Sequence, residues 1–208
     1  MSNTKETEKI LVSKMAGSAK SILISAKTLF WKHGIKRVTV EDICQHAAVS
    51  KMTFYRHFQN KHEVANRVII EVFEHGLQEY RNIMQLQAPF SEKVEKLLVL
   101  KRRETLNLSE EFLRDIYQTD QPDLKNRLEK YGKVMRNELM DDFKRAQENG
   151  WIRKDIKLEF ILYMLDQMDK IIQDKSLLSI YNNVQESSME LTKFFFYGIL
   201  SNDKGDNE

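Results

Sequence analysis

Apolar residues recur along most of this chain at spacings of three and four, which is the period of an α-helix. The longest such stripe lies on one face after Asn60 and consists of Val64, Val68, Ile69, Val72, Phe73, Leu77, Tyr80 and Met84. Further helices are predicted over about 18–33, 40–47, 51–58, from 91, over 109–118, from 122 to before 150, over 155–176 and over 184–200. Because only two prolines and seven glycines interrupt these patterns, the predicted fold class is all-α.

Three helix starts in the N-terminal part have the sequence of a capping box. Thr39-x-x-Asp42, Ser50-x-x-Thr53 and Asn60-x-x-Glu63 each place a short polar side chain where it can accept from the first free backbone N–H groups. The first two starts leave room for a helix of two turns and a tight turn. That arrangement predicts a helix-turn-helix, whose second helix enters the major groove of DNA.

The division into domains follows from these elements. We predict a DNA-binding domain over residues 18–62 and a second domain over 63–201, with flexible segments at 1–17 and 202–208. Residues 1–65 contain eleven Lys and Arg against five Asp and Glu, a net charge of +6 that leaves −4 for the rest. A basic head on an acidic body is typical of a polyanion-binding domain attached to a domain that does not bind polyanions. The alternative is a helical interaction module whose basic head binds an acidic protein.

The second helix of the motif has the chemistry to recognise DNA. If Phe54 and Phe58 point inward, the helical period places Met52 and Arg56 on the opposite face, flanked by Thr53 and Tyr55. Arg can bond guanine through two hydrogen bonds, Thr can contact a base edge, Tyr can bond phosphate, and Met offers apolar contact. Lys51 and Lys61 stand at helix N-termini, which favour phosphate.

These motifs resemble a known family. The chain contains Ile24-Ser-Ala-Lys-Thr-Leu-Phe30, His33-Gly34, Val38-Thr-Val-Glu-Asp-Ile43, Ala48-Val-Ser-Lys51, Phe54-Tyr-Arg-His-Phe58 and Asn60-Lys61. Over about residues 18–70 it is similar to the TetR/AcrR family of bacterial transcriptional regulators. The resemblance implies nine helices, a homodimer, double-stranded operator DNA as partner and repression relieved by a small molecule. It carries contact roles onto Thr39, Lys51, Met52, Thr53, Tyr55, Arg56, His57 and Lys61. The chain departs from the family pattern at Ala48, where Gly is usual.

The second domain must then supply dimerisation and the ligand site. The last two predicted helices are apolar over more than one face, so they are candidates for a four-helix dimer interface. The residues expected there are Leu158, Ile161, Leu162, Leu165, Met168, Phe194, Phe195 and Tyr197; the alternative is that they complete the core of one subunit. Aromatic and Met side chains that could line an apolar pocket, or belong to the core, are Phe73, Tyr80, Met84, Phe112, Tyr117, Tyr131 and Met135. No charged residue stands out on an apolar helix face, so the charge of the ligand is left open.

Other classes of protein are disfavoured by the sequence. The five histidines form no i, i+3 or i+4 pair, and Cys44 is the only cysteine, so we expect no metal site, no cofactor and no disulfide. No phosphate-binding glycine loop or nucleophile motif predicts an enzyme. No apolar segment is long enough for a membrane span, and we expect a cytoplasmic protein. An activator, or a ligand-independent DNA-organising protein of the same fold, is the alternative function.

Overall fold

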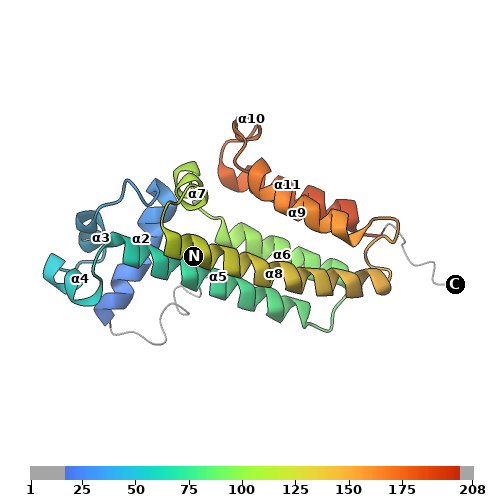
Figure 1. Ribbon diagram of the computed structural model, residues 1–208, viewed down its shortest axis with the longest axis horizontal. Coiled ribbons are helices and arrows are strands. Elements are labelled where there is room, and N and C mark those ends of the chain that lie inside the picture. Colours follow the sequence, from blue (N-terminus) through green and yellow to red (C-terminus); the bar gives the residue numbers. More distant parts are fainter. Residues whose placement is uncertain (1–16, 202–208) are drawn as a thin grey trace. The chain divides into compact units, whose positions relative to one another are not determined.

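The computed structural model describes residues 17–201, apart from the side chain of Asp169. Residues 1–16 and 202–208, which include most of the two segments predicted to be flexible, lie outside this range. The described chain is all-α, as predicted, and contains α2 (Gly17–His33), α3 (Val40–His46), α4 (Lys51–His57), α5 (Lys61–Met84), α6 (Phe90–Glu104), α7 (Glu110–Tyr117), α8 (Pro122–Glu148), α9 (Leu158–Ile171), α10 (Lys175–Leu178) and α11 (Val184–Ile199) (Figure 1). Its one β feature is an isolated antiparallel bridge between Ile152 and Leu200.

Two compact units make up the fold. Within the described residues, the head unit comprises 17–76 together with Asn107–Arg127, and the body unit comprises Leu77–Leu106 together with 128–201. The sequence predicted a boundary near residue 62 instead. Two helices, α5 and α8, contribute residues to both units, and α7 belongs to the head although more than thirty residues separate it from Gly76.

The head unit is built around fully buried apolar side chains of its helices. Ile22, Phe30, Ile43, Phe54 and Val64 are each 0% exposed. Helix α2 packs against α3, α4 and α7, and the rings of Trp31 and Phe112 lie 4.2 Å apart between centroids. Burial of these residues fixes the position of α3 and α4, the two helices of the predicted motif.

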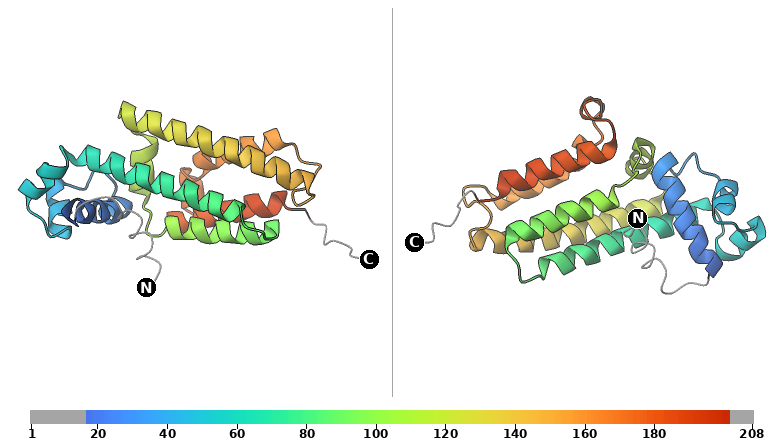
Figure 2. Two further views of the ribbon diagram at one scale, coloured as in Figure 1. Left: turned by 90° about the horizontal axis from the view of Figure 1, so that it is seen from below. Right: turned by 180° about the vertical axis from the view of Figure 1, so that it is seen from behind.

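The body unit has one continuous apolar core. Its buried members include Val94 of α6, Phe143 of α8, Ile161 of α9 and Phe196 of α11. Helix α11 packs on α6, and Figure 2 shows the two helices side by side. Two polar links cross from the end of α5 to α8: Tyr80 donates to Asp142 at 2.6 Å, and Arg81 binds both carboxylate oxygens of Glu138. None of the described helices is long and apolar enough to cross a membrane.

Three predicted helix boundaries are wrong, for local reasons. Pro89, and not Ser91, is the N-cap of α6, which begins at Phe90 without a side-chain cap. Helix α9 begins at Leu158, after the turn in which Asp155 pairs with Arg153. It ends at Ile171, since Asp174 accepts from Ser176 N–H and starts the separate α10, which makes ten described helices instead of nine.

Candidate nucleic-acid interface

The start of α3 is held by a complete capping box, as predicted. Thr39 Oγ1 accepts from Asp42 N–H at 3.1 Å, and Asp42 Oδ2 accepts from Thr39 N–H at 2.8 Å and from the Thr39 hydroxyl at 2.7 Å. These donors, the backbone N–H foremost, lower the pKa of Asp42. The carboxylate therefore stays ionised at neutral pH and fixes the first turn of α3.

The turn between α3 and α4 contains a residue with positive φ. Ala48 has φ +53°, its N–H donates to Gln45 O at 3.2 Å, and Val49 N–H donates to Cys44 O at 3.0 Å. This pair of bonds is a Schellman motif, whose left-handed position is usually Gly. Ala occupies it here at a cost of about 1 kcal/mol, so the departure from the family pattern leaves the turn intact.

Helix α4 presents one face to the head core and the other to solvent. Phe54 is 0% and Phe58 4% exposed, whereas Met52 is 82% and Tyr55 56% exposed; Arg56 is exposed as well. The predicted orientation of the helix is confirmed. An exposed Met next to Tyr and Arg forms a surface of mixed apolar and cationic character, which is suited to base edges and phosphates.

The other predicted contact residues already have partners within the head. Lys51 pairs with Glu41 of α3, a bond that lowers the pKa of Glu41. His57 Nε2 lies 2.7 Å from Ser18 Oγ, and Thr53 Oγ1 lies 3.0 Å from Ser50 Oγ. The sequence analysis did not predict the ion pair between Lys51 and Glu41. The signal for it was an acidic residue ten positions before Lys51, on the preceding helix of the motif.

Lys61 is the most enclosed of the predicted phosphate contacts. Its Nζ donates to the Lys36 carbonyl at 3.1 Å, and desolvation lowers its pKa. The side chain therefore links the start of α5 to the loop after α2. Its contribution to DNA binding remains a prediction.

Helix α7 is joined to the same loop through a buried carboxylate. Asp115, 8% exposed, accepts from Lys36 N–H at 2.9 Å and lies 3.9 Å from Lys36 Nζ. The prediction that no charged residue is trapped on an apolar face is thus wrong at Asp115, and also at Lys93 of α6, which is 9% exposed. The partner of Asp115 lies 79 positions away, beyond the reach of any helical pattern.

The residues predicted to line a ligand pocket are distributed over both units. Phe73, Phe112 and Tyr117 belong to the head, and Tyr80, Met84, Tyr131 and Met135 belong to the body. Phe112 and Tyr80 are buried, whereas Phe73 and Tyr117 are each 43% exposed. Met84 lines a surface pocket of the body unit.

The residues predicted to form a dimer interface fall into two groups. Ile161, Leu162 and Phe195 are buried within the body unit itself, and Leu158, Leu165 and Met168 pack against its core. In contrast, Phe194 is 77% and Tyr197 54% exposed. On α9 the exposed aromatic side chains are Phe160 and Tyr163, which lie on the second apolar side of that helix.

The comparison with protein families finds a match within the head unit. The family described as "Bacterial regulatory proteins, tetR family" matches residues 22–68, which contain α3, α4 and their connecting turn. Over these residues the chain is similar to the tetR family. The matched range includes all of α4 and therefore its exposed face. Among the chain's described residues, no cluster of His, Cys, Asp or Glu could hold a metal ion.

Solved structures extend the likeness from these residues to most of the fold. The chain is similar to a protein from Saccharomonospora viridis described as a transcriptional regulator and solved in complex with choline, with TM-score 0.71 and 15% identity over 90% of this chain and 100% of that one. A TetR/AcrR-family regulator from Thermobifida fusca has TM-score 0.64 and 16% identity over 86% and 97%. The SmeT–triclosan complex has TM-score 0.64 and 18% identity over 90% and 94%. Comparison with curated protein sequences gives no match.

Proposed function

We propose that this protein is a sequence-specific DNA-binding regulator of transcription, and that it acts as a repressor released from its operator by a small molecule. The observation that carries the proposal is the exposed face of α4, with Met52, Tyr55 and Arg56 directed outward from a helix anchored by two buried Phe rings. A short helix of this kind, preceded by a second capped helix, fits the major groove.

Each exposed group has a distinct role in the proposed complex. Arg56 is the residue that reads a base, because a guanidinium can donate two parallel bonds to guanine. Tyr55 and Thr53 reach phosphate or a base edge, and Met52 contacts a thymine methyl group. The family resemblance assigns Thr39 and His57 to DNA contact. In the proposed complex they act by positioning helix starts, Thr39 that of α3 and His57 that of α2. Lys51 releases Glu41 on DNA binding and pairs with a phosphate instead.

A homodimer is the second part of the proposal. Phe160, Tyr163, Phe194 and Tyr197 are large aromatic side chains, each more than half exposed, on the last two long helices of the body unit. Exposed apolar groups of this size are typical of an interface. A second copy would cover them and place two copies of α4 on half-sites about 34 Å apart or a multiple of that distance.

The third part is a ligand of largely apolar character. The proteins solved with triclosan and with choline share this fold, and the body unit contains the Met and aromatic side chains that an adaptable apolar site requires. Helix α5 is unbroken from Lys61 to Met84 and contributes to both units. A ligand that shifts this helix would change the placement of the heads. A regulator of chromosomal genes acts in the cytoplasm, and we place this protein there.

Selection of bound fragments from the host genome, followed by a salt titration, tests the proposal. The selected fragment should stay bound at salt concentrations that release a random duplex of equal length, because non-specific binding depends on phosphate contacts alone. Equal loss of both duplexes with salt would contradict sequence-specific recognition. Binding of neither duplex in dilute buffer would remove DNA binding altogether and leave the interaction-module alternative.

A further inference from the structure

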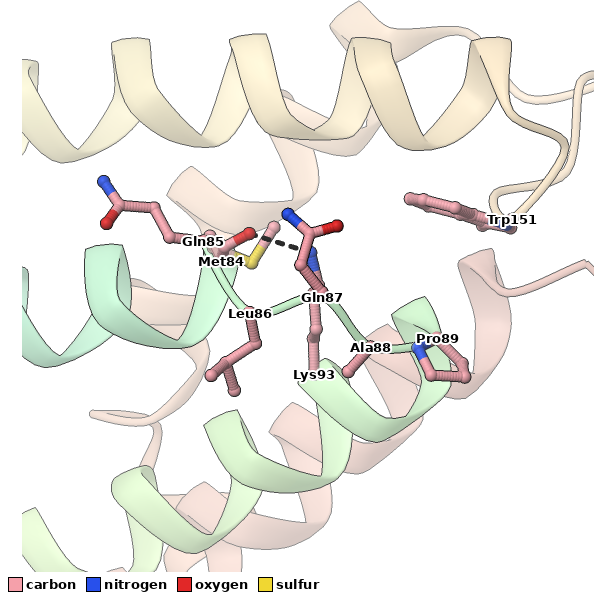
Figure 3. Close-up of a pocket in the computed structure, with 8 residues that line it drawn as sticks. All are labelled: Met84, Gln85, Leu86, Gln87, Ala88, Pro89, Lys93 and Trp151. Atoms are coloured by element: carbon pink, nitrogen blue, oxygen red, sulfur yellow. Dashed lines mark hydrogen bonds between the residues drawn. The ribbon is translucent and has the colours of Figure 1, made fainter.

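A surface pocket of about 620 Å³ lies in the body unit at the connection between α5 and α6. Figure 3 shows it, with Met84 at the end of α5, Leu86, Gln87 and Pro89 in the connection, Lys93 on the first turns of α6, and Trp151 opposite. The pocket shares only Met84 with the residues predicted to line a ligand site.

The ammonium group of Lys93 lacks the partners that a buried charge requires. Lys93 is 9% exposed, and its Nζ donates one hydrogen bond, to the Met84 carbonyl at 2.8 Å. An ammonium group has three donors, and among the described residues it forms no ion pair with a carboxylate. A buried cation without a counter-charge is unfavourable, so an anion in the pocket would complete this site.

The start of α6 adds a second favourable feature for an anion. Pro89 is the N-cap, and it provides no side-chain hydrogen bond to the first turn, which leaves the positive end of this fifteen-residue helix uncapped. The acidic residue of that turn, Glu92, is exposed and pairs with Lys96 at 3.2 Å. The pocket therefore borders two positive groups, Lys93 and the helix start.

The rest of the wall combines the amide side chains of Gln85 and Gln87 with apolar groups that suit an organic ligand. Trp151 is 42% exposed and stacks on Phe90, with ring centroids 6.0 Å apart and an interplanar angle of 12°. Phe90 supports one side of the Trp151 indole by stacking on it. Met84 and Leu86 add apolar surface to the pocket. A ligand with both a negative charge and an apolar part would use each of these features.

We propose that this pocket binds a small organic carboxylate, whose charged group contacts Lys93 and whose apolar part lies against Trp151. The carboxylate accepts the Nζ–H donors that Met84 leaves free. The binding site is independent of DNA recognition, so it can be tested whether or not the protein binds an operator.

Phenylacetate and its neutral analogue phenylacetamide provide a test on the full-length protein. The chain has two tryptophans and hence two indole N–H signals in a ¹⁵N correlation spectrum, which Trp151→Phe assigns. Phenylacetate should shift the Trp151 signal saturably and leave that of Trp31, which is buried in the head unit, unchanged. An equal shift with phenylacetamide, or no shift of the Trp151 signal with either compound, would overturn the proposal.

Two substitutions on α6 locate the charge. Lys93→Met keeps an unbranched side chain of similar size and removes the charge, and it should weaken phenylacetate binding by about tenfold or more. Lys96→Met, which removes an exposed cation three residues along the same helix, should leave binding unchanged. If Lys93→Met lowered thermal stability but bound phenylacetate as well as the wild type, Lys93 would be only a cap for the end of α5. Should that variant fail to fold, the comparison of the two compounds on the wild type still decides.

Discussion

Gly34 lies so close to Asp115 that any side chain at position 34 would collide with the Asp115 carboxylate. A Cβ atom added to Gly34 would stand 2.8 Å from Asp115 Oδ2 and 2.9 Å from Glu111 Cβ, and Gly34 also has φ +79°. The glycine thus ends α2 in a left-handed conformation and at the same time admits α7 against the loop that leads to α3. Within the head unit, this contact holds α7 against the loop that precedes α3.

Substitution of Gly34 should therefore destabilise the head. Gly34→Ala meets both the unfavourable φ and the contact with α7, and it should lower the free energy of unfolding by about 2 kcal/mol or more. Gly132→Ala is the matched control, because Gly132 lies within α8 and its added Cβ would meet nothing within 4 Å. The control should raise stability by about 0.5–1 kcal/mol. Urea unfolding of both variants measures the difference, and a loss of equal size in both would show that α7 imposes no constraint.

The bond between Glu41 and Lys51 should restrain DNA binding. Because the bond from Lys51 lowers the pKa of Glu41, this carboxylate is ionised at neutral pH and competes with phosphate for Lys51. Glu41→Gln should tighten binding to every duplex. It should also steepen the fall of the binding constant with salt concentration by the amount that about one additional phosphate contact contributes. Glu92→Gln, which breaks an exposed Glu–Lys pair in the body unit, should change neither. A salt slope that Glu41→Gln leaves unaltered would mean that Lys51 does not reach the backbone.

Arg56 and Lys61 should differ in what they contribute to binding. Arg56→Ala should cost about 1–3 kcal/mol of discrimination at one base position, whereas Lys61→Ala should weaken binding to all sequences alike. Competition between the selected operator and single-base variants of it measures both effects. If the two substitutions lowered affinity equally on every sequence, Arg56 would not read a base.

The buried hydrogen bond between Tyr80 and Asp142 should stabilise the body unit. Burial raises the pKa of Tyr80, so the phenol remains a donor throughout the neutral range. Tyr80→Phe leaves the Asp142 carboxylate with one donor fewer and should cost about 1–3 kcal/mol of unfolding free energy. Gln78→Ala removes an exposed hydrogen bond to Asn82 Oδ1, of 3.0 Å, and should change stability by less than about 0.5 kcal/mol. Thermal unfolding distinguishes them, and similar losses would contradict the assigned difference in burial.

The exposed face of α11 should carry the dimer contact. Phe194→Glu places a charge at a side chain that is 77% exposed in the single chain, so it should convert a dimer to a folded monomer. Ile180→Glu alters a residue of similar exposure, 73%, outside α9 and α11, and should leave the dimer intact. Sedimentation measures the mass, and circular dichroism confirms that helix content is retained. A wild-type monomer, or a dimeric Phe194→Glu variant, would place the interface elsewhere or exclude it.

The sequence allowed the motif to be predicted because its signals are local. The cap of α3 joins Thr39 to Asp42, and the cap of α4 joins Ser50 to Thr53, so each pair is visible within four residues. Lys93 was also within reach: it stands three residues after Phe90 and one before Val94, in the apolar stripe of its helix. Its burial could have been predicted from that position, but the absence of a carboxylate partner could not.

The sequence shows that α9 and α11 each have two apolar sides. It does not show which of these sides packs into the core of the body unit and which stays exposed. Ile161, Leu162 and Phe195 lie in the body core, and Phe160, Tyr163, Phe194 and Tyr197 remain exposed. Hydrophobic periodicity indicates that one side of a helix is shielded from water. The pattern is the same whether that side packs in a core or in an interface. The sequence alone therefore determined the helices, their caps and the outward face of α4, since these depend on neighbours within one or two turns. Only the tertiary structure decided which charges are buried and which aromatic side chains remain uncovered, because those contacts join residues far apart in the chain.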